Sequence, residues 1–88
     1  MIEKIVTIIN KAGMHTRPAS NIVKIASKFR SDFYIIKNGY KINGKSIIGV
    51  MTLAAEQGST LTLSFEGEDE QKASVEVIKF FEEGFGEL

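Results

Sequence analysis

The spacing of hydrophobic and polar positions changes several times along this chain, and each spacing predicts one element. Residues Ile2 to Ile9 are mostly β-branched and apolar, which favours a strand, and the turn-forming run Asn10 to Gly13 follows them. A helix is expected from about Thr16 to Lys28, because apolar residues recur there with a period of about 3.6. Its apolar stripe consists of Ala19, Ile22, Val23 and Ala26.

The middle of the chain predicts a β-hairpin and then a short helix. Residues Phe33 to Lys37 and Tyr40 to Asn43 have the composition of strands, and the pair Asn38-Gly39 between them tolerates the positive φ angles of a type I′ turn. Ser46 to about Ala55 predicts a helix with Ser46 as its N-cap. Gly49 inside this segment weakens the helix by about 1 kcal/mol relative to alanine.

The last third of the chain predicts one strand and one helix. Residues Thr60 to Glu66 alternate strictly, which is typical of an antiparallel strand with one buried face, formed here by Leu61, Leu63 and Phe65. The acidic run Glu68 to Glu70 favours the start of a helix, which is expected to end near Gly84. The buried stripe of that helix is expected to include Ala73, Val77, Phe80 and Phe81.

The predicted order of elements is therefore β-α-β-β-α-β-α. Strands with a single apolar face need cover on one side only, so we expect an α+β fold. The expected architecture is a two-layer open-faced sandwich, in which a four-stranded antiparallel sheet carries three helices on one face. The chain has 88 residues and no linker-like stretch, so residues 1–88 are expected to form a single domain.

Composition excludes several classes of function. The chain has no cysteine, which rules out disulfides and thiolate chemistry and suggests a reducing cytoplasm. It has no apolar run near the roughly 18 residues that span a bilayer, so no membrane insertion is expected. Eleven basic residues balance eleven acidic ones, which argues against direct nucleic-acid binding. Most of the basic residues lie in the first half of the chain. This asymmetry predicts either a basic face that docks onto acidic partners or a surface of ordinary mixed charge.

His15 is the only histidine, and it stands between the glycine-containing loop and the first predicted helix. Unpaired amides and the helix dipole would stabilise an anion there, and Arg17 adds a guanidinium suited to phosphate. A neutral imidazole nitrogen is a nucleophile, so this site would hold a phosphohistidine. The alternative is an exposed or capping histidine without chemistry. No metal site is expected, because no cysteine or carboxylate cluster accompanies this one histidine.

Ser46 is the second candidate, because a phosphate there would lie at the start of the second predicted helix. The alternative is a plain N-cap. More apolar residues follow Ser46 than a short helix can bury on one side. Ile47, Ile48 and Met51 therefore form either an exposed patch for protein docking or ordinary core packing.

The segment Gly13 to Ala19, with the order Gly-Met-His-Thr-Arg-Pro-Ala, resembles the active-site segment of HPr. HPr is the histidine-containing phosphocarrier family of the bacterial phosphoenolpyruvate-dependent sugar phosphotransferase system. Residues Lys45 to Met51 resemble the regulatory serine segment of the family, and Glu83 to Glu87 resembles its C-terminus. The resemblance extends over nearly the whole chain. Met14 and Thr16 depart slightly from the usual residues, and neither departure removes a phosphoryl-handling group.

The resemblance implies a carrier protein, not an enzyme, that works in the cytoplasm without a cofactor. Enzyme I, phosphorylated by phosphoenolpyruvate, would pass a phosphoryl group to Nδ1 of His15, which would donate it to the IIA domains of sugar permeases. Arg17 and the backbone amides of Thr16 and Arg17 would stabilise the phosphoryl group. The docking surface implied for these partners is Thr16, Ser20, Ile47, Ile48 and Met51.

The resemblance also implies regulation at Ser46. An HPr kinase/phosphorylase would phosphorylate this serine, and the product would bind a transcription factor of the catabolite-control type. An alternative function follows, that of a regulatory interaction module acting mainly through Ser46 and partner binding. The intact segment from His15 to Ala19 favours the phosphoryl relay, because a purely regulatory module has no evident need for the nucleophile. A monomer is expected for a small relay that serves several partners.

Overall fold

The computed structural model describes residues 1–88, and its elements follow the predicted order. The three α-helices and four strands are followed by one 3-10 turn at the end of the chain. The elements are β1 (Ile2–Thr7), α1 (Thr16–Ala26), β2 (Asp32–Lys37), β3 (Tyr40–Asn43), α2 (Ile47–Thr52), β4 (Thr60–Glu66), α3 (Glu70–Glu82) and η1 (Gly84–Gly86).

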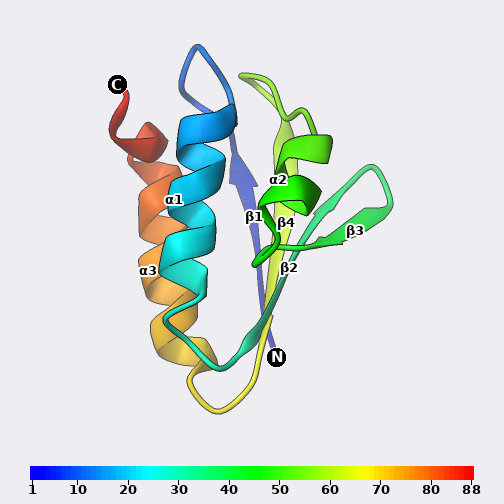
Figure 1. Cartoon of the computed structure of the whole chain (residues 1–88), viewed down its shortest axis with the longest axis vertical. Coiled ribbons are helices and arrows are strands. Elements are labelled where there is room, and N and C mark those ends of the chain that lie inside the picture. Colours follow the sequence, from blue (N-terminus) through cyan, green and yellow to red (C-terminus); the bar gives the residue numbers. More distant parts are fainter.

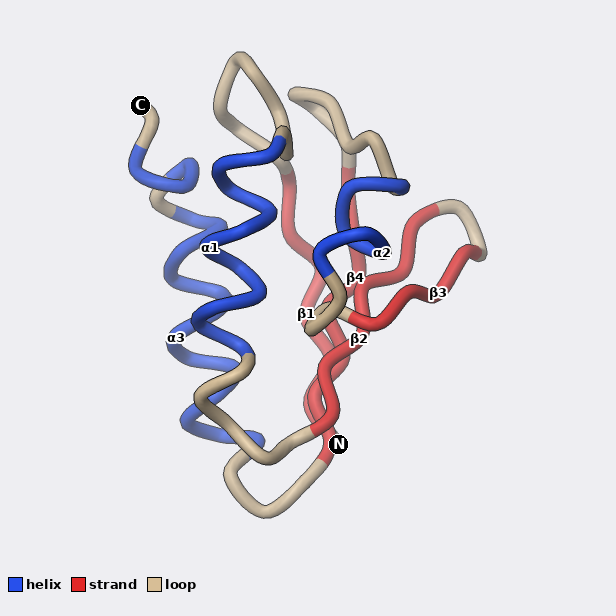
Figure 2. Tube along the Cα trace, viewed as in Figure 1, coloured by secondary structure: helices blue, strands red, loops and turns tan.

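The four strands form one antiparallel sheet in the order β1-β4-β2-β3. The helices lie on one side of it, where α1 and α3 run side by side and α2 lies next to α1 and the β2–β3 hairpin (Figure 1). The helical layer and the strand layer are separated clearly when the chain is coloured by secondary structure (Figure 2). The predicted two-layer α+β sandwich is confirmed.

The core lies between the sheet and the helices, and the alternation along β4 sets its centre. Leu61, Leu63 and Phe65 are fully buried, and the Phe65 ring stacks on Phe33 with 4.8 Å between ring centroids. Ser64 points to the opposite face as predicted, yet it is also buried. The reason is that Glu3 and Tyr34 flank it on the two neighbouring strands.

Four predicted details are corrected by the structure. The second helix ends at Thr52 instead of near Ala55, because Ala54 adopts a positive φ of 47° and turns the chain. This turn lets the Ala55 carbonyl accept a hydrogen bond from the Met14 amide at 2.9 Å.

Phe80 is only half-buried, since its ring packs beside Phe85 at the rim of the core. The first strand and first helix each end two residues earlier than predicted, at Thr7 and Ala26.

The start of α3 is tied to the loop that follows α1 through the carboxylate of Asp69. This carboxylate accepts hydrogen bonds from the Ser31 hydroxyl, from the Arg30 amide at 2.9 Å and from the Ser31 amide at 2.9 Å. The Ser31 hydroxyl and the Arg30 amide are the main reasons why the pKa of Asp69 falls from 3.8 to about 2.

Replacing Asp69 with asparagine is expected to lower the melting temperature at neutral pH. A carboxyl with a lowered pKa stabilises the fold above its unfolded pKa of 3.8, and this stabilisation is lost as the pH falls towards about 2. The difference in melting temperature between wild type and Asp69→Asn should therefore be constant above pH 5 and shrink below pH 4. Thermal unfolding between pH 7 and pH 2 measures it, with the exposed neighbour substitution Glu68→Gln as control. A difference that stays constant down to pH 2 would contradict this account.

Candidate functional site

His15 is the N-cap residue of α1, and the first turn of that helix is at its upper end in Figure 1. Its backbone is extended, with φ −82° and ψ −170°, and its carbonyl accepts a hydrogen bond from the Ala19 amide at 3.0 Å. The side chain makes no capping hydrogen bond, and 42% of it is exposed. The backbone therefore does the structural work of the cap, and the imidazole is available to solvent.

The loop before His15 is held by close packing against the segment after α2. Gly13 has a φ of +70°, and a Cβ at this position would lie 2.6 Å from the Ala55 carbonyl oxygen. Met14 next to it is buried in the core. Only glycine fits the position of Gly13, and this close approach fixes the place from which α1 starts.

The first turn of α1 provides the features of an anion site. No acidic residue lies in this turn, and Pro18 has no N–H that would need a partner. The amides of Thr16 and Arg17 have no partner within the helix, because a first turn has no preceding carbonyls. The Arg17 side chain is exposed and forms no ion pair. The structure thus places His15, Thr16 and Arg17 together, as the sequence predicts.

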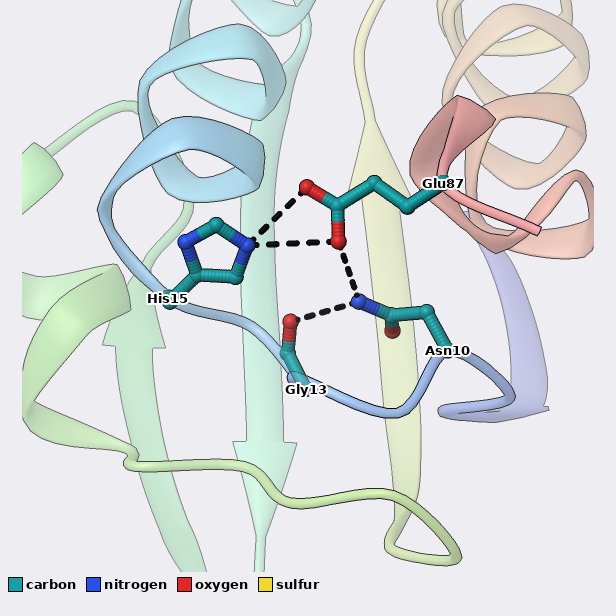
Figure 3. A network of polar contacts seen from close by, with 4 residues as sticks. All are labelled: Asn10, Gly13, His15 and Glu87. Atoms are coloured by element: carbon teal, nitrogen blue, oxygen red, sulfur yellow. Dashed lines mark hydrogen bonds and ion pairs between the residues drawn. The ribbon is translucent and has the colours of Figure 1, made fainter.

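A carboxylate from the far end of the chain contacts the imidazole of His15. Nε2 of His15 lies 2.9 Å from Oε2 and 3.2 Å from Oε1 of Glu87, and Nδ2 of Asn10 donates to Oε1 at 2.8 Å (Figure 3). Partial burial alone would raise the pKa of the Glu87 carboxyl. The hydrogen bonds from Asn10 and His15 and the charges of His15 and Arg17 outweigh it and lower that pKa.

Sequence reasoning missed both Glu87 and Asn10 as members of the site. They are separated from each other by 77 residues, and Glu87 from His15 by 72. Asn10 has the composition of a simple turn, and Glu87 entered the analysis only through the resemblance of the C-terminus. No pattern in the sequence indicates that Glu87 lies close to Asn10 and His15, so this contact is seen only in the folded structure.

Ser46 is the N-cap of α2, as predicted, and its Oγ accepts a hydrogen bond from the Gly49 amide at 3.2 Å. The three apolar residues proposed for docking are exposed, most of all Ile48 at 74%, while Val50 faces the core. The exposed patch, rather than ordinary core packing, is thus the arrangement that the structure shows for Ile47, Ile48 and Met51. Thr16 is exposed as well, and Ser20 is half-buried.

The surroundings of His15 form no enclosed pocket. The four hollows on the surface are lined by other residues, mostly from the hairpin, β1 and α3. No group of three or more His, Cys, Asp or Glu side chains is placed to hold a metal ion. None of the helices has the length and apolar character required to cross a membrane.

Comparison with known proteins gives the chain its relatives. Residues 2–83 match the family model described as the PTS HPr component phosphorylation site. The HPr-like protein Crh of Halalkalibacterium halodurans is 48% identical over 82 residues, which are 93% of this chain and 98% of that protein. The phosphocarrier protein HPr of Treponema pallidum is 42% identical over 87 residues, which are 99% of each.

Solved structures agree with these relatives. The crystal structure of HPr from Thermoanaerobacter tengcongensis, at 43% identity, superposes with a TM-score of 0.95 and covers 100% of this chain and 99% of that one. A structure of the HPr dimer from the same organism, at 44% identity, gives a TM-score of 0.79 and covers 99% of this chain and 100% of that one.

The fold and these relatives define a phosphoryl-carrier protein, a class whose members hold a phosphoryl group for other proteins and catalyse no reaction of their own. The same matches identify this chain as a carrier and not as an enzyme. Within this class, the chain belongs to the HPr family of the phosphotransferase system. The resemblance seen in the sequence is confirmed.

Proposed function

We propose that this protein carries a phosphoryl group on Nδ1 of His15, from phosphorylated enzyme I to the IIA domains of sugar permeases. The observation that supports this most is the placement of His15. Its exposed imidazole stands at the N-cap of α1, beside the free amides of Thr16 and Arg17. An anion bound next to the imidazole gains both hydrogen bonds and the positive end of the helix dipole.

The transfer step needs little from the carrier itself. The lone pair of Nδ1 attacks phosphorus, the new N–P bond forms, and the bond to the group on enzyme I breaks with its electron pair. Negative charge spreads over the three phosphoryl oxygens, where the amides of Thr16 and Arg17 and the Arg17 guanidinium offset it. The partner supplies the in-line geometry, which fits a histidine that lies on an open surface.

The partners would dock on the exposed surface formed by Thr16, Ser20, Ile47, Ile48 and Met51. These residues are carried by α1 and α2, and the two helices pack against each other (Figure 1). A patch of exposed apolar side chains next to a reactive group is typical of a protein–protein contact. One surface would then serve enzyme I and the IIA domains in turn.

Phosphoryl transfer from phosphoenolpyruvate through purified enzyme I tests this proposal. The wild-type protein should gain one phosphoryl group that is lost in mild acid and kept in base, as expected of phosphohistidine. Enzyme I and phosphoenolpyruvate must both be needed for the label. If the folded protein takes no label from an enzyme I of demonstrated activity, the relay proposal is wrong.

A second candidate function is a regulatory interaction module. The 48% identity with the HPr-like protein Crh favours it, together with the position of Ser46 at the start of α2. In this function an HPr kinase/phosphorylase phosphorylates Ser46, and the product binds a catabolite-control transcription factor. The absence of label on His15, combined with kinase-dependent label on Ser46, would favour this module over the relay.

Ser46→Asp is expected to weaken the binding of enzyme I by about 10-fold or more. The new carboxylate would stand at the edge of the apolar patch of Ile47, Ile48 and Met51, and docking would remove it from water without a partner. Isothermal titration with purified enzyme I measures the dissociation constant.

Ser46→Ala is the matched control for this experiment. It removes the hydrogen bond to the Gly49 amide and costs about 1 kcal/mol of stability, but it adds no charge. Its affinity for enzyme I should stay close to that of wild type. Equal affinities for the aspartate variant and wild type would place Ser46 outside the contact.

The remaining properties follow from the same proposal. The carrier would act in the cytoplasm as one domain of residues 1–88, as a monomer, and without direct contact to nucleic acid or insertion into a membrane. Sedimentation equilibrium tests the oligomeric state, and a stable dimer at micromolar concentration would contradict the monomer.

A further inference from the structure

We propose that Glu87 is a positioning residue that sets the tautomer of His15 and so leaves Nδ1 free to accept the phosphoryl group. This inference rests on the proposed function of His15 as the phosphoryl acceptor. It adds to that function a residue from the opposite end of the chain and a reason why one ring nitrogen, and not the other, is the nucleophile.

The argument begins with the two nitrogens of a neutral imidazole. One nitrogen carries the proton and donates, while the other carries the lone pair and accepts. A carboxylate is only an acceptor, and both oxygens of Glu87 lie within 3.2 Å of Nε2. The proton must therefore be on Nε2. Nδ1 keeps the lone pair and points away from Glu87 (Figure 3).

Asn10 holds the carboxylate in place. This residue is 1% exposed, and its Nδ2 donates to the Gly13 carbonyl at 2.8 Å as well as to Oε1 of Glu87 at 2.8 Å. One buried amide thus joins the carboxylate to the loop that carries His15. The position of Glu87 relative to the imidazole is fixed by this loop and does not depend on chance contact between two surface side chains.

The turn at the C-terminus aims Glu87 at this site. Phe85 has a φ of +59°, a conformation that non-glycine residues rarely adopt, and its ring packs edge-on against Phe81 with 5.0 Å between centroids. Gly84 before it has a φ of +61°, and a Cβ there would lie 2.5 Å from Cγ of Leu88. Packing in the core therefore stabilises a left-handed turn that directs the chain back towards the start of α1.

The transfer step explains what this arrangement contributes. With the proton on Nε2, Nδ1 attacks phosphorus without first losing a proton, and the displaced group on enzyme I takes the electrons of the broken bond. Nε2 keeps its proton, so the phosphorylated ring carries a positive charge. The Glu87 carboxylate next to Nε2 stabilises that charge. Glu87 itself stays ionised near neutral pH, since its pKa is lowered.

Nitrogen-15 NMR of His15 and transfer kinetics together test the proposal. The wild-type spectrum at a pH where the ring is neutral should show the proton on Nε2. In Glu87→Gln the amide accepts from or donates to Nε2, so the fraction with the proton on Nδ1 should rise. The rate of phosphoryl transfer from enzyme I should fall by about 2- to 5-fold, as for loss of a partly exposed ion pair.

Glu83→Gln is the matched control, because it removes the same charge from an exposed residue of the same segment that makes no contact with His15. It should leave both the tautomer and the rate unchanged. Suppose that the wild type accepts the phosphoryl group and that Glu87→Gln shows the same tautomer and the same transfer rate as the wild type. This result would overturn the role of Glu87 and leave the relay intact. A wild type that takes no label would overturn the relay itself, and with it any role of Glu87 in transfer.

Discussion

Replacing His15 with alanine is expected to abolish acceptance of the phosphoryl group from enzyme I and to leave the fold intact. His15 is the only histidine of the chain, so no other imidazole replaces it. The N-cap of α1 uses the backbone of His15, and the side chain adds only the contact with Glu87. Label from phosphoenolpyruvate and a thermal melt of the same sample measure the two halves of this prediction.

The control for this substitution is Glu66→Ala. Glu66 is exposed at the end of β4 that lies away from the loop before His15, and it should leave the label complete. A His15→Ala protein that still accepts acid-labile phosphate from enzyme I would show that the acceptor lies elsewhere. A His15→Ala protein that unfolds would instead show that the imidazole, through Glu87, supports the fold.

Replacing Arg17 with glutamate is expected to slow phosphoryl transfer by about 10- to 100-fold. A hydrogen bond to a charged group contributes about 1.5 to 3 kcal/mol, and each 1.4 kcal/mol is a factor of about ten in rate. Arg17 lies two residues after His15 at the same helix start, and its positive charge helps to lower the pKa of the Glu87 carboxyl, which contacts His15. The new carboxylate would also repel the phosphoryl oxygens.

Transfer rates over a range of enzyme I concentrations separate this effect from weaker docking. A lower rate at saturation indicates loss of phosphoryl stabilisation, while a higher half-saturating concentration indicates loss of docking. Arg17→Lys keeps the charge without the planar fork, so its rate should lie between those of wild type and the glutamate variant. Unchanged rates for Arg17→Glu would remove Arg17 from the mechanism.

Most of the fold follows from local patterns because each pattern has a local cause. The alternation along Thr60 to Glu66 matches the pleat of a strand, and Asn38-Gly39 both adopt the positive φ angles that the turn needs. The early end of α2 has a distant cause. Ala54 turns so that Ala55 meets Met14, and no property of the local sequence shows that.

The site divides in the same way. His15 and Arg17 occupy adjacent positions of one helix start, so their proximity follows from their spacing along the chain. Glu87 and Asn10 come together only because β1 and α3 pack side by side and the left-handed turn at Phe85 follows α3. Long-range contacts of this kind depend on the whole tertiary structure, which is why the sequence predicts the reacting group but not the residues that orient it.

The first strand, β1, lies at the edge of the sheet and pairs with β4 and no other strand. This pairing affects the order in which the sheet can form during synthesis. The first strand leaves the ribosome long before residues 60–66, so it has no neighbour while α1 and the β2–β3 hairpin form from local contacts. The sheet closes only when the last third of the protein has emerged. Glu87 is synthesised later still, so its contact with His15 can form only after all four strands have been made.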